Sequence, residues 1–334
     1  MTLKFTTKTF LRQLVGWVMS ISLVSILIYK VDTDSVINTL KSVKLNLVSY
    51  ILLIVILSTL LRAVRWKIIL GSVYRVSFHR ALEGIVIGYF TNLILPLRGG
   101  EVIRAHYIGL VTKKSSFSML STIVIERLFD GLSMGVIILL SLLNIGSNIR
   151  TRLPSLLLPI LAIFFILLMI FLASYKKDSI SELSWFRNLK ERIYGCRLGF
   201  LKYIQSFFAG LSILNSWIKA LYVFGLSSLI WLVTSFAIIL SAGAFGHEIG
   251  YTESLIVLGI LIFALSIPST PGFVGTFHAG MTYGLVLFGI PKDVALSSSI
   301  LFHVITFLPF VIWGPLLVYK YGMKINLKAV EVKR

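Results

Sequence analysis

The sequence predicts an all-α polytopic membrane protein, a single integral membrane domain with about six full spans and two re-entrant hairpins of broken helix. The first observation is composition, because 57% of the 334 residues are hydrophobic and 13% are charged, whereas about a quarter are charged in soluble domains. The second is a mean hydropathy of +0.93. The third is that apolar stretches of roughly the 20 residues needed to cross a bilayer recur along the chain.

The charge balance excludes a nucleic-acid partner once hydropathy is considered. Lys and Arg number 32 and Asp and Glu 13, which gives a formal net charge of +19. In a soluble protein this excess would indicate nucleic-acid binding. In so apolar a chain the basic residues must lie in short loops between spans, where they set the orientation and contact anionic lipid. We therefore expect membrane lipid as the partner.

Six apolar stretches are predicted to be single spans. They cover residues 14–29, 47–61, 117–143, 153–174, 218–240 and 294–319. The first follows three basic residues, as a signal peptide would, but no small-residue cleavage site comes after it, so we expect it to be retained. Residues 175–217 mix charged and aromatic side chains, which is typical of an amphipathic helix on the cytoplasmic surface of the membrane.

Two further apolar stretches are interrupted by proline and glycine, which break helices. Residues 81–110 contain the break LPLRGG at 95–100, and residues 254–290 contain the break IPSTPG at 267–272. We interpret both as re-entrant hairpins, the first entering from the cytoplasm and the second from outside. Each is followed by a long span, so the two halves are expected to form an inverted repeat, an arrangement that places a transporter's binding site near the bilayer midplane.

The distribution of basic residues supports this topology. With a cytoplasmic N-terminus and two re-entrant hairpins, twenty-five Lys and Arg residues lie inside, six lie outside, and Arg127 falls within a span. The inside residues include Arg62 and Arg65, which we assign to the loop after the second span. Such a bias is what the positive-inside rule requires. The prediction is a multi-pass protein of the inner or plasma membrane with both termini in the cytoplasm.

The first break carries the strongest candidate for a binding site. Arg98, Glu101 and Arg104 recur at intervals of three on a helix expected to begin near Gly99 and Gly100. A helix that starts within the membrane presents free N–H groups and the positive end of its dipole, and arginine adds bidentate donors, which together suit an anion such as phosphate. The alternative is that both arginines are positive-inside anchors.

Three charged residues, Glu126, Arg127 and Asp130, interrupt the predicted span 117–143. Ionisable residues at membrane depth usually face the bundle interior, pair with one another and mark pathways or proton relays. We expect one of the two carboxylates to pair with Arg98 or Arg104. Gating or proton transfer and a purely structural ion-pair lock between helices both remain open.

The second break offers hydroxyl groups and histidines. Ser269 and Thr270 precede Pro271, so we expect an N-cap with proline at the first helical position. A lipid headgroup could bind Ser269, Thr270, Gly272 and Gly275, and a proton relay could use His278 and His303. A structural role for each histidine is the alternative. The histidines form no recognisable zinc ligand set and Cys196 is the single cysteine, so we expect neither metal nor cofactor.

Three motifs in order resemble the lysylphosphatidylglycerol synthase transmembrane-region family, also called flippase-like domain proteins. They are NLILPLRGGEVIRA from Asn92, ERLFD from Glu126 and PGFVGTFH from Pro271. The resemblance implies an integral inner-membrane protein whose best understood relatives move aminoacylated phospholipid between leaflets, while other members are tied to lipid-linked sugars or hopanoids. Many members carry Glu where His278 stands and Arg where His303 stands, which points to a different subgroup or substrate.

The resemblance also bears on enzymatic activity. The soluble aminoacyl-transferring domain of the bifunctional synthases does not follow the membrane region in this sequence, so we expect no lipid lysylation by this chain alone. A separate lipid-modifying synthase is a candidate partner, and the sequence leaves open whether such an enzyme supplies the substrate. The sequence favours a lipid flippase for an anionic or phosphate-linked lipid. The alternatives are an integral membrane transferase or phosphatase acting on a lipid headgroup, and a scaffold or a transporter of a small soluble anion. No catalytic residue is assigned.

Overall fold

The computed structural model describes residues 33–95, 98–144, 216–266 and 270–323, and within these ranges every regular element is a helix. The predicted spans 14–29 and 153–174 lie outside the described residues, as does nearly all of the amphipathic segment 175–217. The described part is therefore an α-helical bundle, as predicted, while the count of six spans stays a prediction.

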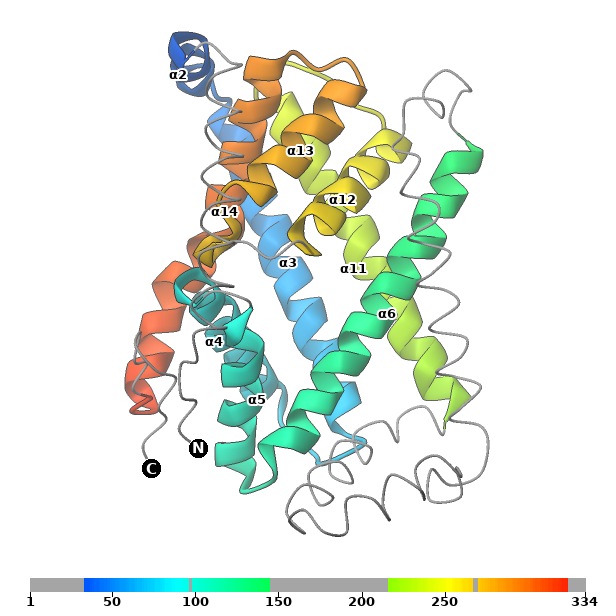
Figure 1. The fold of residues 1–334 in the computed structure, drawn as a ribbon, viewed down its shortest axis with the longest axis vertical. Coiled ribbons are helices and arrows are strands. Elements are labelled where there is room, and N and C mark those ends of the chain that lie inside the picture. The colour runs from blue at the N-terminus through cyan, green and yellow to red at the C-terminus, as the bar shows by residue number, and fades with distance from the viewer. Residues whose placement is uncertain (1–32, 96–97, 145–215, 267–269, 324–334) are drawn as a thin grey trace, which may run out of the picture.

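Four long helices frame the bundle (Figure 1). They are α3 (Leu45–Leu70), α6 (Ser116–Leu143), α11 (Trp217–Gly243) and α14 (Lys292–Lys320), and the short α2 (Thr33–Lys41) precedes them. Three of these described helices, α3, α11 and α14, are long and apolar enough to cross a membrane. Helix α6 is as long as these, but carries three charged residues near its middle.

Helix α3 corrects the predicted boundary of the second span. The prediction ended this span at residue 61 and assigned Arg62 and Arg65 to a cytoplasmic loop, whereas the helix continues to Leu70 and buries both arginines. Burial is tolerated because Arg65 meets carboxylates of α6 and Arg62 lies over the ring of Trp231. Basic residues after an apolar run therefore do not end this helix.

Two pairs of shorter helices form where breaks were predicted. Helices α4 (Phe78–Ile94) and α5 (Gly99–Thr112) pack against each other across the first break, residues 95–98. Helices α12 (Tyr251–Ser266) and α13 (Thr276–Leu287) do so across the second break, residues 267–275, which contains the 3₁₀ turn η3 (Pro271–Phe273). In Figure 1 the first pair lies in the lower half of the view and the second in the upper half.

The second break departs from the predicted cap. Thr270 and Pro271 begin only the 3₁₀ turn, and the α-helix starts at Thr276. The reason is a run of left-handed backbone, with φ of 71° at Gly272, 60° at Phe273 and 93° at Gly275. Such angles are incompatible with a continuous right-handed helix. The break is therefore longer than the sequence pattern indicates.

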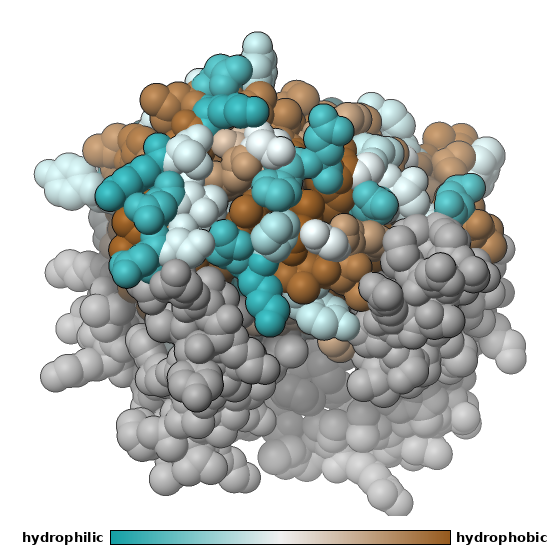
Figure 2. All heavy atoms as spheres, turned by 90° about the horizontal axis from the view of Figure 1, so that it is seen from above, coloured by the Kyte–Doolittle hydropathy of each residue, from teal (hydrophilic) through white to brown (hydrophobic). Residues whose placement is uncertain are grey.

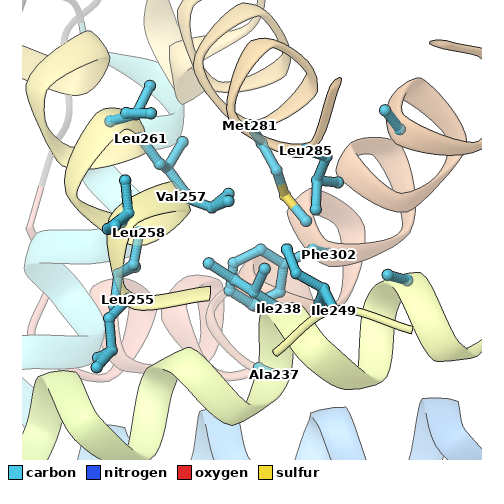
Figure 3. Packing of buried hydrophobic residues seen from close by; sticks show 14 of the residues in the cluster. Ala237, Ile238, Ile249, Leu255, Val257, Leu258, Leu261, Met281, Leu285 and Phe302 are labelled. Carbon is cyan, nitrogen blue, oxygen red and sulfur yellow. The ribbon is translucent and has the colours of Figure 1, made fainter. Parts of the chain in front are cut away.

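The described helices pack around three hydrophobic cores. Apolar residues of α12 and α13, such as Val257 and Met281, pack above Ile238 of α11 and Phe302 of α14 in the second half (Figure 3). A separate core between α3, α4, α5 and α6 includes Trp66 and Tyr107. A third, smaller core packs Val86 of α4 against Phe307 and Phe310 of α14, so apolar contacts also join the two halves.

The helix ends fall into two groups. Helix α3 begins, α11 ends and α14 begins at the upper end of Figure 1, where the basic residues Lys41, Lys44 and Lys292 are exposed. Viewed from above, this end has hydrophilic residues scattered among hydrophobic ones (Figure 2). The opposite end carries more basic residues, among them Lys67, Arg75, Arg80, Lys113, Lys114, Lys219 and Lys320.

Candidate functional site

A cavity of about 440 Å³ lies between the two halves, and we call it the central cavity. Every described α-helix except α2 contributes residues to its lining. Its aromatic lining comprises Tyr89, Trp231, Phe273, Phe277, Phe302, Phe307 and Phe310. Its charged lining comprises Arg62, Arg98, Glu101, Arg127 and Asp130. The volume falls within the range of about 300–1,000 Å³ that is typical of small-molecule sites, and few polar groups among apolar walls are typical as well.

Arg98 connects the two breaks. It is the N-cap residue of α5, with a left-handed φ of 55°, and it lines the central cavity. Its guanidinium donates a hydrogen bond of 2.9 Å to the backbone oxygen of Leu265 near the end of α12. The same group lies 5.9 Å from the centre of the Phe273 ring in η3. The side chain from the first half thus reaches the backbone and ring of the second.

The glycines of the first break serve helix packing. A Cβ atom on Gly100 would come within 2.1 Å of the backbone oxygen of Gly88, and one on Gly99 would lie 3.1 Å from Leu95 Cβ. Asn92 Oδ1 accepts a 2.8 Å hydrogen bond from the Gly100 N–H. Helix α4 therefore occupies the space at Gly100 that was predicted for a ligand, and Asn92 satisfies one of the predicted free donors while also lining the cavity.

Six charged side chains next to the cavity form an ion cluster. Its members are Arg65, Glu101, Arg104, Glu126, Arg127 and Asp130. Arg65 contacts Asp130 directly. Arg104 and Arg65 also lie 2.5 Å and 3.0 Å from Glu126, respectively. Three cations meet three anions, so the ion cluster as a whole is neutral.

The cluster confirms one predicted pairing and divides the predicted residues into two sets. Arg104 pairs with Glu126, and both are buried away from the cavity lining, with Arg104 also lying 3.5 Å from the centre of the Trp66 ring. Glu101, Arg127 and Asp130 face the cavity. A direct ligand contact is thus open to the second set, whereas Arg104 and Glu126 have the surroundings of an ion-pair lock.

Arg127 joins the two carboxylates that line the cavity. Its Nε lies 3.1 Å from Glu101 Oε1, and its Nη1 donates a 3.1 Å hydrogen bond to Asp130 Oδ2 one helical turn further along α6. Glu101 is a residue of α5, so this arginine fastens the α4–α5 pair to α6. Neither carboxylate at the cavity is left without a basic partner.

Two functional candidates, Arg62 and Arg65, were missed by the sequence prediction. Arg65 is fully buried, pairs with Asp130 and donates a 2.7 Å hydrogen bond to Ser227 of α11. Arg62 lines the central cavity one helical turn earlier, 4.7 Å from the centre of the Trp231 ring. The available signal was the apolar pattern that continues past both arginines to Leu70, which favours helix over loop.

Most predicted residues of the second break lie behind the cavity wall. Thr270, Gly272, Gly275, His278 and His303 are absent from its lining, to which the turn contributes Phe273. Ser269 is outside the described residues. Headgroup contacts by these residues stay predictions.

The histidines make hydrogen bonds within the second half. His303 Nε2 donates to the Gly272 backbone oxygen over 2.8 Å, and His278 Nδ1 lies 3.2 Å from Ser299 Oγ. The two rings are 4.9 Å apart. These contacts give both histidines a structural role, while the proton relay stays a prediction. No group of three or more potential metal ligands gathers within the residues that the structure describes.

A separate polar cluster lies at the end of α14. Glu83 of α4 accepts hydrogen bonds from Tyr107, from Tyr321 at 2.9 Å and from Lys320 at 3.1 Å, and Arg80 contacts the same carboxylate at 3.3 Å. These contacts fasten the last turn of α14 to the α4–α5 pair, on the side of the bundle that has more basic residues.

The family of the chain follows from its similarity to known proteins. Residues 13–314 match the family described as the lysylphosphatidylglycerol synthase transmembrane region. The chain belongs to this family. The predicted resemblance is thereby confirmed, and the protein is a membrane protein of the lysylphosphatidylglycerol synthase transmembrane-region family.

Two curated archaeal relatives carry the name UPF0104 membrane protein. One, from Pyrococcus horikoshii, is 23% identical in an alignment of 325 residues that covers 91% of this chain and 95% of that protein. The other, from Methanothermobacter thermautotrophicus, is 25% identical in an alignment of 266 residues that covers 74% of this chain and 75% of that protein. Both names agree with the membrane location that the apolar helices indicate.

Proposed function

We propose that this member of the family moves a lipid with an anionic headgroup between the leaflets of the membrane through the central cavity. The observation that carries the proposal is the position of Arg98, which lines a cavity between two broken helix pairs and reaches from one break to the other. In transporters, discontinuous helices that meet in this way form the substrate site. The family takes its name from a synthase of a phospholipid, which favours a lipid as the substrate.

The lining of the cavity suits an amphipathic molecule. Arg98 and Arg127 supply cationic hydrogen-bond donors for the headgroup, and Phe273 and Phe307 belong to an aromatic wall against which acyl chains can lie. Buried arginines favour oxyanions because their planar N–H groups form two parallel hydrogen bonds to one group. A soluble anion would leave the aromatic wall without a function.

The proposed topology has six spans and two re-entrant hairpins, with both termini in the cytoplasm. It is supported by the two groups of helix ends, since the end with α4, α5 and Lys320 has more basic residues than the end with Lys41, Lys44 and Lys292. The α4–α5 pair then enters from the cytoplasm and the α12–α13 pair from outside. A headgroup would reach the cavity from either leaflet when one pair moves relative to the other.

Within this proposal the ion cluster is structural. Glu126 holds Arg65 and Arg104 in a buried network, and so positions the cavity-facing Glu101, Arg127 and Asp130. Breaking a buried ion pair exposes an uncompensated charge, which is costly. We therefore assign gating to movements between helix pairs and assign the carboxylates to holding α5 and α6 together.

A leaflet-transfer assay tests the proposal. The full chain is reconstituted in liposomes with a fluorescent phosphatidylglycerol, and loss of the protected inner-leaflet signal to a membrane-impermeant quencher is followed over time. Wild-type protein is expected to transfer lipid. Arg98→Gln is expected to transfer it at about one tenth of the wild-type rate or below, because a charged contact to the headgroup is lost.

Arg75→Gln is the matched control. Arg75 is an exposed arginine in the loop between α3 and α4, so its replacement removes the same charge without touching the cavity and is expected to leave the rate unchanged. Transfer by wild type no faster than by protein-free liposomes would contradict the proposal. Release of the headgroup from the labelled lipid would instead indicate a transferase or phosphatase.

A further inference from the structure

The surroundings of Arg62 are not explained by a purely structural role. Its side chain is on α3, it is 9% exposed, and it lines the central cavity. Among the described residues no carboxylate lies within 4.0 Å of it, and its close partner is the ring of Trp231, 4.7 Å from the guanidinium carbon. A buried cation without an anion is unfavourable, and an ionisable residue at membrane depth usually belongs to a substrate path.

Arg98, at the start of α5, also lines the central cavity without a carboxylate partner among the described residues. Its guanidinium has a backbone oxygen and the Phe273 ring as neighbours, and within the described ranges it has no carboxylate partner either. By comparison, Arg75 and Arg80 at the end of the bundle are exposed, as topological anchors should be. Arg62 and Arg98 therefore differ from anchors in both burial and position.

The acidic residues of the site cannot neutralise these two arginines. Glu101 pairs with Arg127, and Asp130 pairs with both Arg65 and Arg127. The ion cluster is neutral by itself, so within the part of the chain that the structure describes the cavity lining carries two uncompensated positive charges. Among the same residues, no carboxylate that lines the cavity is free to receive an ammonium group.

We propose that the headgroup bound in the central cavity is a dianionic phosphomonoester held between Arg62 and Arg98, an inference that rests on the proposed function. A phosphomonoester carries about −1.5 to −2 charges at pH 7, which matches the two unpaired arginines. A phosphodiester carries one negative charge and leaves one arginine uncompensated. A lysyl ester adds two ammonium groups, which would meet arginines and no free acid.

The geometry around Arg62 suits this role. The guanidinium carbon lies over the Trp231 ring, and the indole Nε1 donates a 3.2 Å hydrogen bond to the Asp130 backbone oxygen, which fixes the ring. Stacking on an aromatic face leaves the N–H groups in the guanidinium plane free to bind two phosphate oxygens. Arg62 is thus held in place while its donors remain available to a ligand in the cavity.

Binding to a panel of lipids with matched acyl chains tests the inference. Full-length protein in nanodiscs is titrated with phosphatidate, phosphatidylglycerol and lysylphosphatidylglycerol, and bound lipid is counted by native mass spectrometry. Phosphatidate is expected to bind about tenfold more tightly than phosphatidylglycerol, and lysylphosphatidylglycerol most weakly. Arg62→Gln and Arg98→Gln should each abolish most of the preference for phosphatidate, whereas Arg75→Gln should keep it.

Two further arms keep the outcome decisive. Arg62→Lys retains the charge and is expected to retain part of the preference, and the wild-type ranking tests the charge argument even if a glutamine variant does not fold. Glycerol 3-phosphate is added as a competitor, since displacement of phosphatidate by this soluble phosphomonoester at equal concentration would indicate a soluble anion as the ligand and overturn the lipid assignment.

The failure of this inference can be distinguished from failure of the proposed function. If phosphatidylglycerol or lysylphosphatidylglycerol binds more tightly than phosphatidate and binding depends on Arg62 and Arg98, the dianionic headgroup is wrong while lipid binding in the cavity stands. If no lipid binds more tightly to wild type than to either glutamine variant, both the inference and the lipid site are overturned.

Discussion

The two halves of the bundle share an architecture and differ in chemistry. Each has a broken helix pair followed by a long helix: α4, α5 and α6 in the first half, and α12, α13 and α14 in the second. The first set contains the ion cluster residues of α5 and α6, whereas residues 254–290 and 294–319 of the second contain no Lys, Arg, Asp or Glu. The second half supplies aromatic, hydroxyl and histidine side chains instead.

The two halves therefore contribute different kinds of side chain to the central cavity. The charges of the ion cluster are held in place by ion pairs between helices. Arg98, which is not a member of the ion cluster, reaches the second half and bonds to the Leu265 backbone oxygen. The second half contributes an apolar wall fastened by hydrogen bonds such as that from His303 to Gly272. We infer that the first half recognises a headgroup and the second accommodates apolar chains, and the predictions below test the two kinds of support separately.

The largest effect is expected for Glu126→Gln in the first half. The change leaves Arg104 without its carboxylate and Arg65 with Asp130 alone, both in buried surroundings. We expect a loss of about 3–5 kcal/mol in the free energy of unfolding, measured by thermal and denaturant unfolding in detergent micelles. Glu248→Gln, on an exposed loop, is the control and should be neutral. A stable Glu126→Gln protein would contradict the structural role of the ion cluster.

Gly100→Ala is expected to be the next most destabilising change. The added Cβ would overlap the backbone oxygen of Gly88, which no side-chain rotation can relieve, so α4 and α5 must separate. A cost of about 3 kcal/mol is expected from such overpacking. Gly225→Ala on α11 is the matched control, because nothing lies within 4 Å of its added Cβ. Equal unfolding midpoints for the two variants would show that the α4–α5 contact is looser than described.

In the second half, His303→Phe should cost less. The side chain stays aromatic and of roughly similar size, but the Gly272 backbone oxygen loses its 2.8 Å hydrogen bond. An unsatisfied buried carbonyl costs about 1–3 kcal/mol, and we expect the lower part of this range. His79→Phe, at an exposed position, serves as the control for the unfolding measurement. If His303→Phe destabilised the protein as much as Glu126→Gln, the contrast between the halves would be wrong.

The smallest effect is expected for Glu83→Gln, where the halves meet at the end of α14. The change removes ion pairs with Arg80 and Lys320 at a partly exposed site. Such pairs contribute less than about 1 kcal/mol, so global stability should hardly change. The last turn of α14, residues 316–320, should however exchange its amide hydrogens faster. Unchanged exchange there would mean that Glu83 does not hold this helix end.

The sequence predicted local features of this fold better than distant pairings. Proline and glycine at 95–100 and 267–272 correctly located both breaks, because their effect on the backbone is local. A pairing of Arg98 or Arg104 with a carboxylate of residues 117–143 was also expected, since few carboxylates lie in apolar helices, and Arg104 pairs with Glu126. The role of Arg65 was missed because its partners, Asp130 and Ser227, are 65 and 162 residues away in the chain.

The candidate site was predicted in part for the same reason. Arg98, Glu101 and Arg127 were identified as polar residues in apolar surroundings, and they line the central cavity. Arg62 was assigned to a loop because its neighbour in space, Trp231, belongs to a helix far along the chain. The exact start of α13 was missed because Phe273 adopts a left-handed backbone conformation, which phenylalanine rarely adopts.

The most direct test of the central claim is to locate a lipid headgroup in the protein. Full-length protein in nanodiscs that contain phosphatidate would be imaged by electron cryomicroscopy. The account predicts headgroup density in the central cavity between Arg62 and Arg98, with acyl chains along the wall that includes Phe273 and Phe307. Lipid density confined to the outer surface of the bundle, with the cavity free of lipid, would contradict it.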